Sequence, residues 1–69
     1  MFQVWMEGFK VNGYEAKHEL LGTYRANTFI EACRFAIADH DLWEDYDRVN
    51  NTVYGCRLFD NELDSMEFD

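Results

Sequence analysis

Carboxylates are the residues whose type and spacing come nearest to a chemical site in this sequence. In the stretch DNELD, Asp60, Glu62 and Asp64 stand at alternate positions, as ligands do in the first half of a calcium-binding loop. The sixth position of such a loop needs glycine for a sharp turn, and here it is Ser65. We therefore predict no metal ion at these carboxylates.

Groups suited to zinc binding or catalysis are few. The nitrogen and sulfur ligands that the sequence offers are His18, Cys33, His40 and Cys56. They show no short ligand spacing, and two cysteines are too few for a disulfide framework. The stretch DHD at 39–41 could raise the pKa of its histidine, but a general base also needs a pocket and a substrate. The sequence predicts a protein that is not an enzyme, with no cofactor and two buried thiols.

Charge is distributed very unevenly along the chain. Fourteen acidic and six basic residues give a formal net charge of -8. Residues 1–38 contain four of each kind, so the whole excess lies in residues 39–69, where ten acidic residues face only Arg48 and Arg57. Such a field repels phosphates and attracts basic surfaces. We therefore expect no direct binding of nucleic acid and a basic host protein as the partner.

The number of these carboxylates would suit a nucleic-acid mimic. A compact chain of this length is about 28 Å wide, and that length of duplex DNA carries roughly eight phosphates per strand. Ten carboxylates on one side could match this charge, and salt would weaken such binding. The same acids could instead serve solubility alone. Asp41 and Glu44 also have the spacing of a cap for a short acidic helix.

Aromatic residues stand among these acids. Trp43 and Tyr46 lie within the acidic stretch, and buried aromatic anchors contribute more to affinity than charges at the rim of an interface. Trp43 could be such an anchor, or it could fold over the small core. The residues that we expect to contact a partner are Asp39, Asp41, Trp43, Glu44, Asp45, Asp47, Asp60, Glu62 and Asp64.

Hydrophobic periodicity predicts the elements that position these residues. Residues 2–6 alternate as a half-buried strand does, and residues 20–26 and 52–59 fit two further strands. Gly8, Asn12 and Gly13 mark a loop or a wide hairpin connection. A capping box at Thr28 and Glu31 predicts a helix over residues 28–38. Its inward stripe is Phe29, Ala32, Cys33, Ala36 and Ile37.

We predict an α+β fold in a single small domain, residues 1–69, in which residues 60–69 could form a flexible tail. The order β-β-α-β suits a three-stranded antiparallel sheet in the order 2-1-3 with one main helix on one face. The opposite face would then be uncovered. Trp5, Val53 and Phe59 could form a partner-binding or homodimer surface there.

The composition is that of a folded globular chain, with 48% hydrophobic and 17% aromatic residues. No segment has the roughly 18 to 20 uncharged apolar residues of a membrane span. The first residues lack the basic region and apolar core of a signal peptide. We expect a cytoplasmic protein that does not bind a membrane.

Three stretches together resemble a family of small bacterial and phage proteins: VWMEGF at 4–9, TFIEAC at 28–33 and YGCRLFDNELD at 54–64. The family shares a Trp-x-Glu-Gly opening, a Ser/Thr-Phe-x-Glu-Ala-Cys helix start and a Gly-Cys-Arg-Leu-Phe-Asp-Asn-Glu ending, and its motifs carry no known reaction. This chain departs afterwards, where SMEFD replaces an Ala-Arg and a Ser-Phe-Gly. The resemblance implies a phage or mobile-element protein. Small acidic proteins from that setting include anti-CRISPR and anti-restriction inhibitors that occupy nucleic-acid sites.

Two functional hypotheses follow from these observations. In the first, the chain is a small acidic inhibitor that occupies a basic nucleic-acid-binding surface of a host protein. In the second, it is an interaction or homodimerisation module that uses the open apolar sheet face, and its charge serves solubility. Binding that is lost at high salt would favour the first hypothesis, and binding that resists salt would favour the second.

Overall fold

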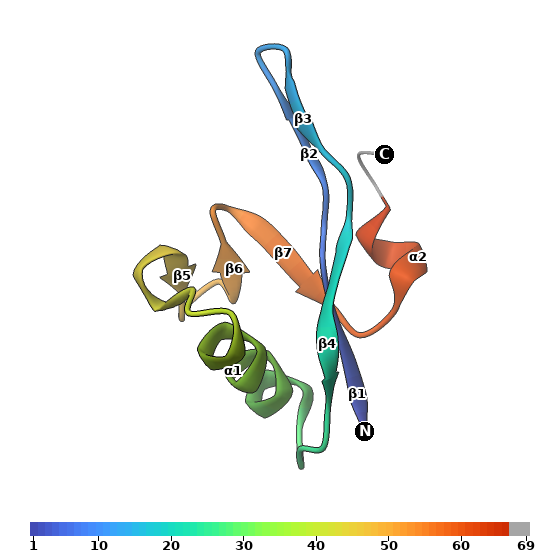
Figure 1. Ribbon diagram of the computed structural model, residues 1–69, viewed down its shortest axis with the longest axis vertical. Coiled ribbons are helices and arrows are strands. Elements are labelled where there is room, and N and C mark those ends of the chain that lie inside the picture. Colours follow the sequence, from blue (N-terminus) through green and yellow to red (C-terminus); the bar gives the residue numbers. More distant parts are fainter. Residues whose placement is uncertain (67–69) are drawn as a thin grey trace.

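The computed structural model describes residues 1–66 (Figure 1). In chain order its elements are β1 (Phe2–Met6), β2 (Phe9–Val11), β3 (Tyr14–Ala16), β4 (Glu19–Tyr24), α1 (Phe29–Asp39), the 3-10 helix η1 (Trp43–Asp45), β5 (Tyr46–Asp47), β6 (Thr52–Val53), β7 (Cys56–Phe59) and α2 (Glu62–Ser65). Five strands form an antiparallel sheet in the order β4-β1-β7-β6-β5, and β2 pairs with β3 in a separate hairpin. The predicted α+β class is confirmed.

The main helix forms where its cap predicts it. The Thr28 hydroxyl accepts a hydrogen bond from the Glu31 N–H at 3.2 Å, which satisfies one amide of the first turn. The Glu31 carboxylate in turn accepts a hydrogen bond from the N–H of Asn27 at 3.1 Å. A standard capping box would use the N–H of Thr28, the next residue, instead. Of the predicted inward stripe, Ala32, Cys33, Ala36 and Ile37 are buried and Phe29 packs against them. The predicted helix and its stripe are confirmed.

The core lies between α1 and the sheet. Val4 of β1, Leu21 of β4 and Leu58 of β7 are buried beneath the helix stripe. The predicted strand order 2-1-3 holds for β4, β1 and β7, because β1 pairs with both neighbours. Cys33 and Cys56 are buried free thiols, as predicted.

The prediction of three strands was incomplete, because the stretch 52–59 is not one strand. Tyr54 and Gly55 have φ angles of 54° and 80°, so they form a two-residue hairpin turn between β6 and β7. Val53 and Cys56 pair across this turn and both point into the core. Val53 is fully buried, and its assignment to an open sheet face was therefore wrong.

Of the two predicted alternatives near the N-terminus, a loop or a hairpin connection, the structure shows a hairpin with a tight turn. Asn12 and Gly13 have φ angles of 50° and 88° and join β2 to β3 directly. An Asn-Gly pair suits such a turn because both central residues need positive φ. The hairpin projects beyond the five-stranded sheet as an extension of β1 and β4 (Figure 1).

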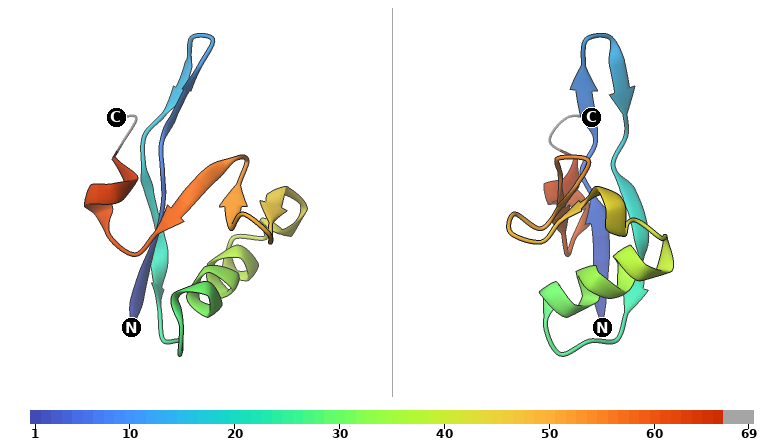
Figure 2. Two further views of the ribbon diagram at one scale, coloured as in Figure 1. Left: turned by 180° about the vertical axis from the view of Figure 1, so that it is seen from behind. Right: turned by 90° about the vertical axis from the view of Figure 1, so that its left-hand side faces the viewer.

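The sheet face opposite α1 is not left uncovered. Residues 62–65 form α2, and Asn61 caps its N-terminus because the Asn61 side chain accepts a hydrogen bond from the N–H of Asp64 at 2.9 Å. This helix packs against β7 and β1. Figures 1 and 2 show α1 and α2 on opposite sides of the sheet. Residues 67–69 of the predicted tail lie outside the described residues.

Within residues 1–66, no helix is long and apolar enough to cross a membrane.

Candidate interaction site

The acidic stretch after α1 forms an exposed edge of the molecule, which we call the acidic edge (residues 39–47). The helix ends at Asp39. The backbone N–H of His40 donates a hydrogen bond to the carbonyl oxygen of Ala36, and the ring of His40 is hydrogen-bonded to the carbonyl oxygen of Leu21. Asp41 then adopts a φ of 54° and redirects the chain into η1. The acidic edge is thus held by the helix end and by β4.

The expected cap of a short acidic helix does not form. Leu42 precedes η1, which makes no side-chain cap hydrogen bond, and the helical turn spans only Trp43–Asp45. The left-handed conformation of Asp41 places that residue outside the capping position. The short acidic helix is therefore present as a single 3-10 turn, and the predicted capping role of Asp41 was wrong.

Some carboxylates of the acidic edge have structural partners. Asp39 accepts a hydrogen bond from the Tyr24 hydroxyl at 2.7 Å. Asp47 accepts hydrogen bonds from the Asn50 side chain at 2.8 Å, from the N–H of Asn50 at 3.2 Å and from the N–H of Val49 at 2.9 Å, and these bonds lower the pKa of Asp47. These two residues stabilise the local fold, which makes them poor candidates for contact with a partner.

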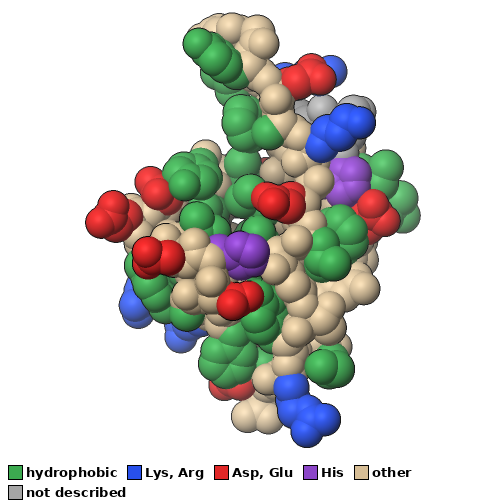
Figure 3. Space-filling model, in the orientation of Figure 1, with side chains coloured by type: hydrophobic (Ala, Val, Ile, Leu, Met, Phe, Trp, Pro, Cys, Tyr) green, Lys and Arg blue, Asp and Glu red, His purple; other side chains and the backbone are tan. Residues whose placement is uncertain are grey.

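Other members of the acidic edge are better placed to meet a partner. Asp41, Glu44 and Asp45 are exposed. In the view of Figure 3, several acidic side chains gather on the left-hand side of the molecule, where η1 and β5 lie in Figure 1. The negative charge of Asp45 and a hydrogen bond to it raise the pKa of the exposed Tyr54. Asp45 therefore links the edge to the turn between β6 and β7.

Trp43 is the aromatic residue of the acidic edge that is most open to a partner. The Trp43 ring stands edge-on to the Tyr46 ring, with ring centroids 5.9 Å apart. The guanidinium carbon of Arg48 lies 5.2 Å from the centroid of the Trp43 ring. Tyr46 packs against the core, whereas Trp43 remains 41% exposed. A ring held in place and half exposed has little freedom to lose on binding, which favours a role as an anchor.

The remaining predicted contacts lie on the other side of the sheet. Asp60 and Asp64 accept hydrogen bonds from the Asn61 side chain at 2.9 and 3.0 Å, and Glu62 lies 2.9 Å from the His18 ring nitrogen. Figures 1 and 2 place α2 across the sheet from η1 and β5. The nine predicted residues therefore form two separate groups. Among residues 1–66, no group of three or more acidic, histidine or cysteine side chains could hold a metal ion.

A hollow beside the acidic edge was not foreseen from the sequence. It has a volume of about 650 Å³ and lies between the base of the hairpin and the turn between β6 and β7. Its apolar lining comes from Met6, Phe9, Val11, Tyr54, Gly55 and Cys56. Figure 3 shows it between the hydrophobic side chains of the hairpin and those over β6 and β7. We call it the hairpin hollow.

The buried carboxylate of Glu7, one of the residues that line the hairpin hollow, is paired with the half-exposed side chain of Arg57. Glu7 is 4% exposed, and its carboxylate accepts hydrogen bonds from the backbone N–H of Arg57 at 2.9 Å and from its guanidinium at 3.0 to 3.2 Å. Burial, and secondarily the charge of Glu7, raises the pKa of the Cys56 thiol. The pair fixes the start of the hairpin to β7 and leaves the hollow itself apolar.

Tyr54 belongs to both the hairpin hollow and the acidic edge. Its backbone N–H donates to the carbonyl oxygen of Asp45 at 3.1 Å, and its exposed ring lines the hollow. An apolar depression and a group of exposed carboxylates therefore share a border. A sequence signal existed only in part, because Phe9 and Val11 alternate with Lys10 but the turn at residues 54 and 55 was read as strand.

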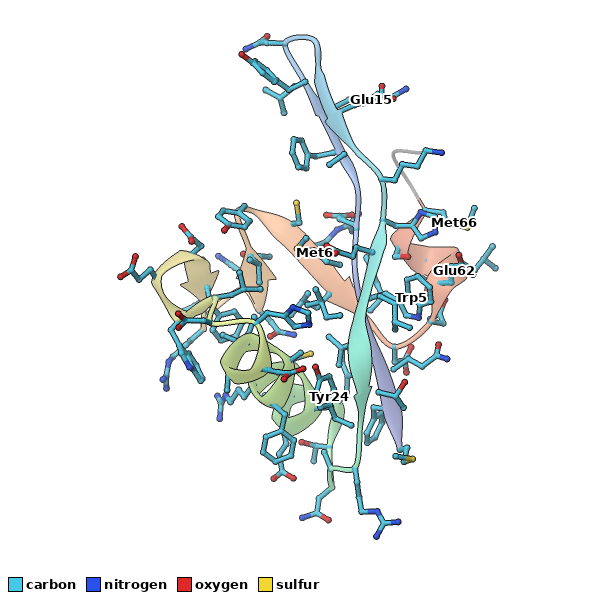
Figure 4. All side chains as sticks on the ribbon, viewed as in Figure 1. Trp5, Met6, Glu15, Tyr24, Glu62 and Met66 are labelled. Atoms are coloured by element: carbon cyan, nitrogen blue, oxygen red, sulfur yellow. The ribbon has the colours of Figure 1, made fainter. Side chains whose placement is uncertain are left out.

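The alternative interface is smaller than expected. Trp5 and Phe59 are cross-strand neighbours, and Trp5 also donates to the Gln3 side chain at 2.8 Å and lies 5.6 Å from the His18 ring. Figure 4 shows Trp5 and Glu62 on the side of α2, with Tyr24 on the side of α1. Because Val53 is buried and α2 packs against β7 and β1, the apolar patch on this face is smaller than the three predicted residues would form.

The architecture defines a small α+β domain with a five-stranded antiparallel sheet, a projecting hairpin, one main helix and a short C-terminal helix. No protein-family model matches the chain, and comparison with curated proteins and with solved structures gives no match either. Its function must therefore be inferred from its surfaces.

Proposed function

We propose that this chain is a non-enzymatic binding protein of a phage or mobile element whose acidic edge docks on a basic surface of a host nucleic-acid-processing protein. The observation that carries the proposal is the half-exposed Trp43 beside the exposed carboxylates of Asp41, Glu44 and Asp45. Carboxylates steer the encounter with a basic groove, and the aromatic ring supplies apolar contact once water is excluded. Occupation of the groove would keep nucleic acid out, as in an anti-CRISPR or anti-restriction inhibitor.

The two groups of acidic residues lie on opposite sides of the sheet, so only one of them can form the contact surface. The acidic edge and the carboxylates around α2 cannot both face one flat partner, because the sheet lies between them (Figure 2). The acidic edge is favoured because the half-exposed ring of Trp43 stands within it. The charge around α2 then contributes to the long-range field and to solubility.

The test is a pull-down from the host at low salt and again at about 0.5 M salt, where the screening length falls to roughly 4 to 5 Å. We expect a basic nucleic-acid-binding protein that is captured at low salt, lost at high salt and displaced by DNA or RNA. The double variant Glu44→Lys, Asp45→Lys should abolish its capture. Asp47 is left unchanged because it caps the turn that contains Val49 and Asn50.

A matched control distinguishes the acidic edge from net charge. The double variant Glu62→Lys, Asp64→Lys changes the total charge by the same amount on the opposite side of the sheet. It should retain capture of the partner with only a modest loss of association rate. Equal loss of capture in both variants would contradict docking through the acidic edge.

A second candidate function rests on the adjacent rings of Trp5 and Phe59. These residues could bind a partner or a second copy of the chain through an apolar contact. Binding of this kind would resist about 0.5 M salt and would fail in Trp5→Ala. Capture that survives Glu44→Lys, Asp45→Lys and is lost in Trp5→Ala would select this function.

A further inference from the structure

The hairpin hollow and the acidic edge together define what a partner must present. We infer that the hollow binds a polypeptide segment of the partner that carries one large apolar side chain next to basic residues. This inference rests on the proposed function and names the part of the partner that the acidic edge recognises. The apolar side chain would enter the hollow while the flanking cations meet Asp45 and Glu44.

The size and lining of the hollow suit a side chain of this kind. Small-molecule sites commonly measure about 300–1,000 Å³ and are lined mainly by apolar groups; the hollow, at about 650 Å³, has room for a large apolar side chain together with the backbone that carries it. Val11 is 58% exposed and Tyr54 is 62% exposed on opposite walls. An apolar side chain between these walls would remove both from water, which is the main source of affinity in an interface core.

The hairpin gives a second reason to expect an occupant. A two-stranded hairpin is only marginally stable by itself, and packing against further apolar surface is what stabilises it. Phe9 and Val11 project from the same face of β2 toward the hollow, because alternate residues of a strand share a face. Lys10 lies between them, so its side chain leaves from the other face. The apolar wall therefore carries no charge that would repel a basic segment.

Charge complementarity selects basic residues beside the anchor. Tyr54 lines the hollow and is in contact with Asp45, so the carboxylates begin where the apolar wall ends. The Glu7 carboxylate, which lines the hollow, is already paired with Arg57, so no cation of the partner is needed inside the hollow to neutralise it. The arrangement thus places apolar surface at the centre and negative charge at one side, and a segment with an apolar side chain next to Lys or Arg matches it.

The experiment uses two defined peptides and the isotope-labelled full chain. The first is Gly-Lys-Arg-Leu-Arg-Lys-Gly, and the second has serine in place of leucine. We expect the leucine peptide to bind at least tenfold more tightly, which is about 1.4 kcal/mol. Only this peptide should shift the backbone amide signals of Val11, Tyr54 and Gly55, whereas both should shift those of Glu44 and Asp45.

Two variants test the two walls of the hollow separately. Val11→Ser removes apolar surface from the hairpin, and Tyr54→Asn removes the ring while supplying a residue that tolerates positive φ. Each should abolish the preference for leucine while leaving binding of the serine peptide unchanged. Val49→Ser is the matched control, because Val49 is 91% exposed and lies outside the hollow. It should retain the full preference.

Each other outcome refutes the inference in a recognisable way. Equal affinity for both peptides, with shifts confined to residues 39–47, would overturn it and leave the proposed function standing. Failure of both peptides to bind at millimolar concentration would contradict the proposed function as well. Self-association that fills the hollow with the hairpin of a second copy, seen as a dimer that Val11→Ser dissociates, would also overturn it.

Discussion

Replacement of Arg57 by methionine should lower the free energy of unfolding substantially, because Arg57 pairs with the buried carboxylate of Glu7. The variant keeps the apolar stem of the side chain but removes the guanidinium that donates to both oxygens of Glu7. The backbone N–H of residue 57 remains as a donor to Glu7, at 2.9 Å in the parent structure. Arg57→Met therefore leaves a buried carboxylate with one donor and no countercharge.

The magnitude follows from the burial of the two partners. Removing one member of a buried ion pair typically costs about 3–5 kcal/mol. Here Glu7 is buried but the Arg57 side chain is 51% exposed, so water can reach the vacated side. We expect the free energy of unfolding to fall by about 2–3 kcal/mol. Domains of this size have about 3–10 kcal/mol in total, so the loss would be a large fraction.

Urea unfolding at neutral pH measures this loss. With a slope of about 1 kcal/mol per molar urea, the midpoint should fall by about 2–3 M. The double variant Glu7→Gln, Arg57→Met removes both charges and should recover at least half of the loss. A midpoint for Arg57→Met within about 0.5 M of the parent value would refute the view that this pair fixes the hairpin base.

Three further predictions concern other parts of the fold. Thr28→Ala should lower the free energy of unfolding by about 1 kcal/mol by removing the helix cap, while Thr28→Ser should change thermal unfolding little. Ile37→Ala should cost about 2–5 kcal/mol in urea unfolding because it opens a cavity under the helix, and Ile30→Ala, on the exposed side of the same helix, should cost far less. Burial, then the hydrogen bond to Asp39 and the charge of that residue, raises the pKa of Tyr24 from 10.0 to about 12. Because the folded state holds this proton more tightly, the associated stability should be intact below pH 10 and lost as the pH rises through about 12; urea midpoints across this range should fall less steeply in Tyr24→Phe.

The sequence predicts the helix and the central strands well because their signals are local. Thr28 and Glu31 define the start of α1, and a spacing of three and four residues defines its buried stripe. The break in the last strand was missed because Tyr54 is an unusual residue for positive φ. A two-residue turn brings residues three apart onto one face, so Val53 moved from the expected outer face into the core.

The candidate site was predictable in its charge and in Trp43, but not in which of its carboxylates are available to a partner. The excess of carboxylates in residues 39–47 is plain from the sequence, but their availability depends on partners far along the chain. Tyr24 binds Asp39 across fifteen positions, and His18 pairs with Glu62 across forty-four. The hairpin hollow depends on the approach of β2 to the turn at Tyr54, which no local pattern encodes.

The projecting hairpin offers a way to detect a bound partner without knowing what it is. β2 and β3 continue the lines of β1 and β4, so opening of the hairpin should begin at Asn12 and Gly13 and spread toward the sheet. Backbone amide hydrogens should then exchange with solvent fastest at the tip and progressively more slowly toward Val4. A molecule that binds across the hollow would slow exchange in the hairpin and so reduce the difference in exchange rate between the hairpin tip and Val4. Hydrogen exchange recorded in the presence of fractionated host proteins would therefore identify the fraction that contains the partner.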